Sequence, residues 1–261
     1  MLLTVSISNR EIQLGFVKED SVLGTAAASH DTRRTSDEYA CIFKELLSLK
    51  GFSPSDFTAA IGASVDPAVT DTVVRAVSDL LGVRMHILTA GTKTGLNILT
   101  DDPSQLGGDL VASAVGALSM YTPPMILVDF GVATTFSVID RNGSFVGCSI
   151  APGVTLSSEA LINSAGLLSN VSQGAPKKCI GTNTEDSMQS GSVYGSAAMV
   201  DGMVERIETE LGYSAAVIAS GGKAADMIVP YCKRDLSRDD SLLLLGLARI
   251  YRRNLRKPKD K

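Results

Sequence analysis

The chain has 261 residues, of which 44% are hydrophobic and 20% are charged, and its formal net charge is −4. This balance is typical of a water-soluble protein, and it excludes nucleic-acid binding through overall charge. No apolar run approaches the ~20 residues of a membrane span, and no secretory signal opens the chain, so we expect a cytoplasmic protein with no membrane partner. The four cysteines are far apart in sequence, which favours reduced, largely buried thiols over a disulfide scaffold or metal cluster.

The first predicted element is a hairpin. Residues 1–17 alternate between apolar and polar runs as strand, turn and strand, and residues 21–30 predict a third strand. Thr35 followed by Glu38 forms a capping-box pattern, which predicts a helix that continues through Leu49.

The rest of the first half predicts a strand, a helix and another strand. These lie at residues 57–64, 69–81 and 85–88, and Gly82 closes the helix. A polar, glycine-rich loop over residues 89–109 follows. It is longer than a simple connection requires, which favours a ligand-binding loop.

Asp109 precedes a helix predicted over residues 110–120. A carboxylate at this position stabilises the helix dipole without any catalytic role, so the residue alone does not decide its function. The segment Tyr121-Thr-Pro-Pro124 ends the helix, and we place a domain boundary there, which gives domains of residues 1–122 and 123–261.

A second hairpin is predicted over residues 125–140. It carries Asp129, Gly131, Thr134 and Thr135 where the first strand meets its turn. A glycine admits close approach of an anion, and hydroxyls and a carboxylate bind phosphate directly or through a cation. The pattern therefore indicates phosphate handling, although an acidic residue beside an ordinary hairpin explains it equally well.

The second half then repeats the plan of the first. We expect these further elements: a strand at 145–150, helices at 156–165 and 185–211, a strand over 216–222, and helices at 224–228 and 242–255. Gly221 and Gly222 join a strand to a helix, a junction that admits a nucleotide. Two such halves suit a phosphotransferase that binds nucleotide between its domains.

Several motifs, in the same order, resemble those of the type III pantothenate kinases, a branch of the acetate kinase, sugar kinase, Hsp70 and actin superfamily. The matching segments are Arg34-Thr-Ser-Asp-Glu-Tyr39, Lys93-Thr-Gly-Leu-Asn-Ile98, Asp102-Pro103 with Gly107-Gly108-Asp109, Val128-Asp-Phe-Gly-Val-Ala-Thr-Thr-Phe136, Ile150-Ala-Pro-Gly153, and Thr184 with Met188-Gln-Ser-Gly191 and Tyr194-Gly195. The resemblance implies an α/β fold of two tandem ribonuclease H-like domains with mixed β-sheets, the actin-like ATPase fold.

The resemblance also implies phosphorylation of pantothenate by ATP in coenzyme A biosynthesis, with magnesium and a monovalent cation, potassium or ammonium. It assigns these roles: Asp109 as general base; Gly107, Gly108 and Thr184 to the substrate; Asp129 to a metal; and Gly131, Thr134, Thr135, Gly221 and Gly222 to phosphate and nucleotide. Family members are dimers whose pantothenate pocket lies at the subunit interface.

The chain departs from the family at the first hairpin. The family opens with D-x-G-N-T, and this chain has Ser6, Ser8 and Arg10 in place of the Asp, Gly and Thr. A serine brings no charge to position a divalent cation. Further departures are Thr100, Leu110 and Val132 in place of the family's Tyr, Arg and Thr.

Three interpretations remain open. We favour a degenerate subunit that completes the site of an intact paralogue in a hetero-oligomer. A homodimeric kinase with altered phosphate handling is the second. The third is a non-catalytic sensor or accessory protein that binds pantothenate, a related metabolite or a macromolecule, and the basic residues between Arg249 and Lys261 give it slight support.

Overall fold

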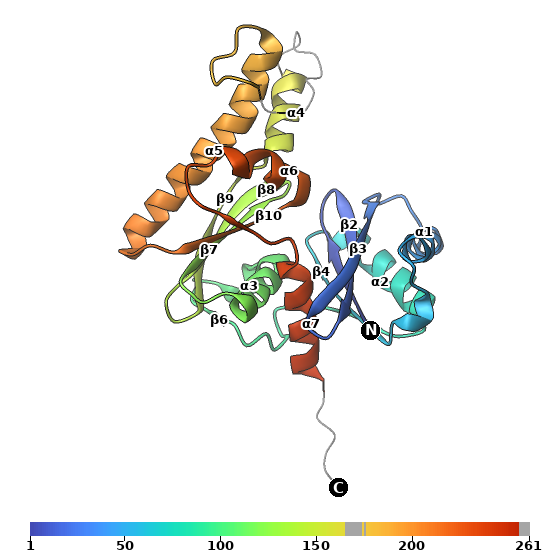
Figure 1. Cartoon of the computed structure of the whole chain (residues 1–261). Helices are drawn as coiled ribbons and strands as arrows, with labels where there is room; N and C mark the ends of the chain where they lie inside the picture. The colour runs from blue at the N-terminus through green and yellow to red at the C-terminus, as the bar shows by residue number, and fades with distance from the viewer. Residues whose placement is uncertain (165–173, 175, 256–261) are drawn as a thin grey trace. The chain divides into compact units, whose positions relative to one another are not determined.

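The structure is a computed structural model that describes residues 1–164, 174 and 176–255. It divides into two compact units, each built around its own sheet (Figure 1). The first unit comprises Met1–Asn97, Asp101–Tyr121 and the chain from Ser241 onward. The second comprises Ile98–Thr100 and Thr122–Asp240.

The first unit contains a five-stranded sheet in the order β3-β2-β1-β4-β5. Its strands are β1 (Leu2–Ile7), β2 (Glu11–Lys18), β3 (Ser21–Ser29), β4 (Ala59–Ser64) and β5 (Met85–Ile87). β1 pairs antiparallel with β2 and parallel with β4, so the predicted first hairpin and third strand are confirmed.

The described part of this unit contains four helices: α1 (Ser36–Leu49), α2 (Pro67–Leu81), α3 (Gly108–Met120) and α7 (Leu242–Asn254). Short 3-10 turns lie at η1 (Pro54–Asp56) and η2 (Pro103–Gln105). The capping box at the start of α1 is confirmed, and α2 ends at Gly82 in the left-handed conformation, with φ of 65°. α2 begins before its predicted start because Asp66 caps it and a proline follows.

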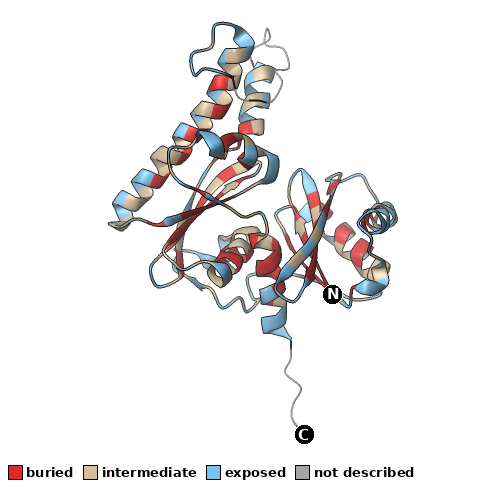
Figure 2. Cartoon of the chain, in the orientation of Figure 1, coloured by how far each residue is buried: buried red, intermediate tan, exposed pale blue. Residues whose placement is uncertain are grey.

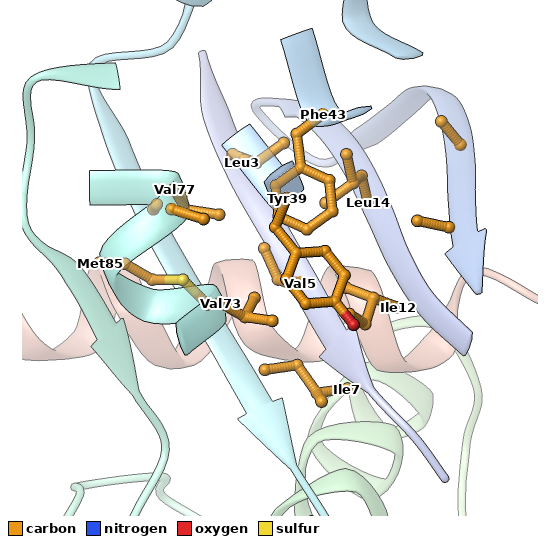
Figure 3. Close-up of a cluster of buried hydrophobic side chains, with 14 of the residues drawn as sticks. Leu3, Val5, Ile7, Ile12, Leu14, Tyr39, Phe43, Val73, Val77 and Met85 are labelled. Carbon is orange, nitrogen blue, oxygen red and sulfur yellow. The ribbon is translucent and has the colours of Figure 1, made fainter. Parts of the chain in front are cut away.

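The core of the first unit lies between the sheet and the pair α1 and α2. Leu3, Val5 and Ile7 of β1 pack there against Tyr39 and Phe43 of α1 (Figure 3). Because side chains alternate along a strand, the residues between them in β1 lie on the opposite face of the sheet.

Helices α3 and α7 pack closely against each other through glycines. A Cβ atom at Gly116 of α3 would overlap the carbonyl oxygen of Leu242, and one at Gly246 of α7 would overlap that of Ala112. Seven residues of α7 are buried, mostly leucines (Figure 2). This packing places α7 in the first unit, whereas the predicted boundary after residue 122 assigns it to the second domain.

The second unit contains a six-stranded sheet in the order β11-β10-β7-β8-β9-β6. Its strands are β6 (Asn97–Ile98), β7 (Met125–Phe130), β8 (Ala133–Ile139), β9 (Ser144–Pro152), β10 (Ala216–Ser220) and β11 (Ser237–Arg238). β7 pairs antiparallel with β8 and parallel with β10. Apart from β6, the order repeats that of the first sheet, which confirms the α/β class and the duplicated plan.

The helices of the second unit are α4 (Val154–Ser164), α5 (Thr184–Leu211) and α6 (Gly222–Ile228), with a 3-10 turn η3 (Val229–Tyr231). Residues of α5 and α6 form a second core with Val128, Phe130 and Phe136. Ala165, where we expected α4 to end, lies outside the described residues.

Two smaller expectations concern the thiols and the membrane. The expected burial of the cysteines is wrong, because Cys41, Cys148 and Cys179 are exposed and Cys232 is half-buried. Within the described residues, no helix combines the length and apolar character needed to cross a bilayer. The cytoplasmic location stays a prediction.

Candidate active site

The second hairpin presents Asp129 beside a hydroxyl from a neighbouring strand. Asp129 lies next to the end of β7, opposite Thr135 of β8 and opposite Ser220 of β10. The Ser220 hydroxyl donates a hydrogen bond of 2.7 Å to Asp129 Oδ1. Asp129 alternates with Val128 and Phe130, which pack on the core, so its carboxylate lies on the other face of the sheet.

The predicted phosphate residues of this hairpin divide between the two faces. Thr135 is in register with Asp129, whereas Thr134 is in register with Phe130 and only 2% exposed. A Cβ at Gly131 would lie 2.9 Å from Asp129 Oδ2, so the glycine leaves room for the carboxylate. Asp129, Gly131 and Thr135 thus form one polar cluster, and Thr134 supports it from the core side.

Gly221 and Gly222 lie beside the second hairpin. The backbone of Gly221 is against Phe130, because a Cβ there would lie 2.6 Å from the Phe130 nitrogen. The N–H groups of both glycines donate to Asp240 Oδ1, at 3.0 and 3.1 Å. Arg238 pairs with the other Asp240 oxygen at 2.9 Å. A nucleotide group that binds these N–H groups has to displace the Asp240 carboxylate.

The first hairpin has the same register and different chemistry. Ser6 holds the position next to the end of β1 that Asp129 holds in β7, and it lies opposite Gln13 and Ala63. The Ser8 hydroxyl donates to the Glu11 carbonyl oxygen at 2.9 Å and accepts from the Glu11 N–H at 3.1 Å and the Arg10 N–H at 3.4 Å. The Ser8 hydroxyl therefore binds two backbone N–H groups of its own turn.

Asp109 lies in the first turn of α3, whose N-cap is Gly107. Burial raises the pKa of this carboxyl above its usual range, and the backbone N–H groups of Leu110 and Asp109 oppose that rise. A Cβ at Gly107 would overlap Asp109 Oδ1, so only glycine leaves the carboxylate this position. At Gly108 a Cβ would meet Leu88 and Ala63 at ordinary contact distances of 3.5 and 3.6 Å.

Thr184 begins α5 and lines a groove in the second unit. The groove has a volume of about 840 Å³. It is lined by Pro152, Val154, Ser157, Ser158, Leu161, Gly181, Thr182, Asn183, Thr184, Ser187, Met188, Gly191, Ser192, Gly195, Ser196 and Met199. Gly153, which precedes α4, donates its N–H to the Val132 oxygen at 2.9 Å, so the groove adjoins the second hairpin. We refer to it below as the α4–α5 groove.

The donor set of the second hairpin fits a magnesium ion that is bound mainly by nucleotide phosphates. Such an ion needs one or two carboxylates and keeps several water ligands, which Asp129 satisfies. Among the described residues there is no group of three or more His, Cys, Asp or Glu side chains able to cage a metal without a nucleotide. Ser6 offers no carboxylate in the first hairpin.

Sequence reasoning did not identify Ser220, Asp240 or Asn183. Ser220 and Asp240 act on residues far away in sequence, which a local pattern cannot show. Asn183 caps α5 by accepting the N–H of Asp186 at 2.9 Å, and the Asn-x-x-Asp spacing was the available signal.

The comparison with protein families gives one match over most of the chain. The profile described as type III pantothenate kinase matches residues 2–206. Proteins named type III pantothenate kinase are similar to this chain in Myxococcus xanthus, at 37% identity over 97% of this chain and 99% of theirs, and in Halalkalibacterium halodurans, at 34% over 98% and 100%.

Solved structures share the fold at low sequence identity. A putative 2-dehydro-3-deoxygalactonokinase from Sinorhizobium meliloti superposes with a TM-score of 0.62 at 11% identity, covering 100% of this chain and 99% of its own. The conserved putative Baf family transcriptional activator from Campylobacter jejuni gives 0.58 at 16% identity, covering 97% and 98%. These likenesses show the actin-like ATPase and sugar kinase fold.

Proposed function

Because the chain belongs to the type III pantothenate kinase family, we propose that it is the degenerate subunit of a hetero-oligomeric pantothenate kinase. In this proposal an intact paralogue supplies the first phosphate hairpin, and this chain supplies Asp109, the second hairpin and the α4–α5 groove. Family and fold imply ATP as the phosphoryl donor, and the proposed acceptor is pantothenate.

The first hairpin is the observation that carries the proposal. Ser6 lies at the position in β1 that is equivalent to Asp129 in β7. The Ser8 hydroxyl accepts hydrogen bonds from the N–H groups of Arg10 and Glu11. A phosphate that approaches this turn gains no metal-binding carboxylate, and it meets Arg10 and Glu11 N–H groups that are already bonded to Ser8. The second hairpin retains both a carboxylate and a glycine turn, although Val132 replaces the family's Thr there. The loss of the carboxylate is therefore confined to the first hairpin.

Asp109 is the proposed general base. In the reaction, the pantothenate hydroxyl oxygen bonds to the γ-phosphorus of ATP, the bond from that phosphorus to the bridging oxygen breaks, and the hydroxyl proton passes to the carboxylate. Because burial raises the pKa of Asp109, its carboxylate accepts that proton more readily than an ordinary carboxylate does. Magnesium would be held at Asp129 and would neutralise phosphate charge, and we extend the same site to a monovalent cation.

Association with a second subunit is supported by apolar side chains near the α4–α5 groove. Ile150 is 67% exposed, Leu161 is 50% exposed and Ile180 is 82% exposed. Exposed apolar residues that gather beside a ligand groove are typical of a surface that another chain covers. The alternative to be tested is that a second copy of this chain covers this surface in a homodimer.

The test measures transfer of the γ-phosphoryl group from ATP to pantothenate. The samples are this chain alone, a family member with an intact D-x-G-N-T, and the co-purified pair. We expect no turnover by the chain alone, turnover by the pair above that of the intact member, and its loss on Asp109→Asn in this chain. Ser6→Asp combined with Ser8→Gly should give the isolated chain measurable turnover.

Two results would contradict the proposal. Turnover by the isolated chain that Asp109→Asn abolishes would make it an independent, homodimeric enzyme. Separate elution of the two chains, with pantothenate bound and never phosphorylated, would favour the non-catalytic sensor. The sensor has one structural argument, which is that the α4–α5 groove is complete without the first hairpin.

A further inference from the structure

We propose that Asp240 sets how tightly the chain binds a nucleotide, because its carboxylate occupies the backbone N–H groups of Gly221 and Gly222. The inference rests on the proposed function, since it takes ATP to bind beside the second hairpin, where these two glycines lie. It deepens that function by naming a residue that opposes binding. The protein carries its own competitor for the anionic part of the nucleotide.

The two glycines that follow β10 hold an anion. Their N–H groups converge on a single atom, Asp240 Oδ1, at 3.0 and 3.1 Å. Gly221 and Gly222 have φ angles of 115° and 53°, in the region that favours glycine. Successive N–H groups that point toward one atom form a concave binding site for an anion. The carboxylate of Asp240 therefore fills a site that the backbone has already shaped.

Arg238 gives this site a positive charge. One guanidinium nitrogen, Nη2, lies 2.9 Å from Asp240 Oδ2 and donates to the Gly222 carbonyl oxygen at 3.3 Å. The other, Nη1, donates to the Ala219 carbonyl oxygen at 3.2 Å, which attaches the side chain to β10. The Arg238 side chain is only 26% exposed. The Asp240 carboxylate thus binds two N–H groups and a guanidinium, a set of donors that also suits a phosphate oxygen.

The group that displaces Asp240 has to be an anion itself. A neutral hydroxyl of the ribose would accept the glycine N–H groups and leave Arg238 without its Asp240 partner. A phosphate oxygen replaces both interactions, because it accepts the N–H groups and also pairs with the guanidinium. The competition therefore concerns the phosphates of the nucleotide and not its adenosine part.

The position of Asp240 makes this exchange possible. Its side chain is 50% exposed and lies on the segment between β11 and α7. The N–H group of Asp239 donates to the Ala219 carbonyl oxygen at 2.9 Å, so the preceding residue stays attached to β10 when the Asp240 side chain turns away. Asp240 is a charged side chain outside the hydrophobic core of the second unit. Its displacement therefore leaves that core intact.

Titration calorimetry with ATP and magnesium, and separately with adenosine, tests the inference on the full chain, alone and in the co-purified pair. Asp240→Ala removes the competing carboxylate, so it should tighten ATP binding about tenfold, a difference of about 1.4 kcal/mol. Asp240→Asn keeps an acceptor oxygen without the charge and should tighten ATP binding by a smaller factor. Adenosine lacks the phosphates and should bind equally well to the unaltered chain and to Asp240→Ala.

Asp226→Ala is the matched control. Asp226 pairs with the same guanidinium, at 3.1 Å, whereas the two glycine N–H groups bond to Asp240. This variant should therefore leave the affinity for ATP unchanged. Equal tightening by Asp226→Ala and Asp240→Ala would trace the gain to a general loss of negative charge and would overturn the inference.

The remaining outcomes separate this inference from the proposed function. Circular dichroism shows whether each variant is folded, and if Asp240→Ala is not, the direction of the change in Asp240→Asn decides. ATP binding by the unaltered chain that the Asp240 variants leave unchanged or weaken overturns the inference alone. Absence of ATP binding by every sample, the co-purified pair included, overturns the proposed function as well.

Discussion

The two hairpins lie at equivalent places in two similar sheets and differ in what fills their turns. After β1 the turn spans residues 8–10 and closes on the Ser8 hydroxyl, whereas after β7 it spans residues 131–132 and begins with a glycine beside Asp129. A side chain that folds back onto its own turn replaces the ligand that an open turn would bind. Under the proposed function, a phosphate site is thus lost by filling its turn with a side chain of the same turn, while strand register and core stay intact.

Asp109 lies outside both hairpins, and its substitution has the largest expected effect on the rate, with which the hairpin variants are compared. Asp109→Asn should lower phosphoryl transfer in the active assembly by about 10²–10⁴-fold, because the acceptor hydroxyl loses its base. Since burial raises the pKa of Asp109, the activity should fall with decreasing pH around a midpoint above the ordinary value of 3.8. Rate profiles against pH measure that midpoint.

The same pKa shift predicts a stability effect. A carboxyl whose folded pKa is raised holds its proton more tightly in the folded state, so its contribution to the free energy of unfolding declines as pH rises from 3.8 toward the folded pKa. Asp109→Asn should remove that decline, as urea unfolding across this pH range would show. If Asp109→Asn left both the acid side of the pH–rate profile and the pH dependence of unfolding unchanged, Asp109 would be excluded as the base.

The direct comparison substitutes the equivalent residue in each hairpin. Asp129→Asn should lower phosphoryl transfer by about 10²–10³-fold, since the charge that holds the cation against the phosphates is removed. Ser6→Ala, at the equivalent register position, should leave the rate within about twofold, because the proposal gives Ser6 no part in the chemistry. Similar losses from both substitutions would show that the first hairpin still binds phosphate.

Gly131→Ala displaces the carboxylate without removing it. The added methyl would lie 2.9 Å from Asp129 Oδ2, which forces the side chain to move by a few tenths of an ångström. Because catalytic groups tolerate little misplacement, we expect a loss of about tenfold in rate. The double variant Gly131→Ala with Asp129→Asn should be no slower than Asp129→Asn alone, and additive losses would contradict this cause.

The smallest effect is expected in the first turn. Ser8→Ala removes the internal partner of the Arg10 and Glu11 N–H groups, which then bind water, and should reduce the free energy of unfolding by about 1 kcal/mol. Urea titration followed by circular dichroism measures it, with Ser55→Ala on η1 as an exposed serine control. No loss of stability, or a loss of phosphoryl transfer, would mean that the hydroxyl has another role.

Local sequence patterns predicted the elements well because each element carries its own signals. The Thr35 and Glu38 capping box and the left-handed Gly82 fix the ends of their helices through contacts within a few residues. The hairpins follow from alternation on either side of a polar turn. These signals are short-range, and the corresponding bounds agree with the structure to within a few residues.

Features that depend on distant residues could not be predicted. The hydrogen bond from Ser220 to Asp129 joins strands that are separated by most of the second half of the sequence, and no local pattern near either residue predicts the other. The same holds for the Asp240 carboxylate at Gly221 and Gly222. The role of the basic end of α7 likewise depends on a distant residue, because Arg249 and Arg252 pair with Asp20 on the turn between β2 and β3.

The close crossing of α3 and α7 has a consequence for how the protein is made. The ribosome completes α3 early and α7 only after the whole second unit has been synthesised. Until then α3, which carries Asp109, lacks the surface of α7 that Gly116 contacts, and the apolar face of α3 stays uncovered. Co-translational folding should therefore proceed from the second unit to the first, in an order opposite to that in which most of their residues emerge.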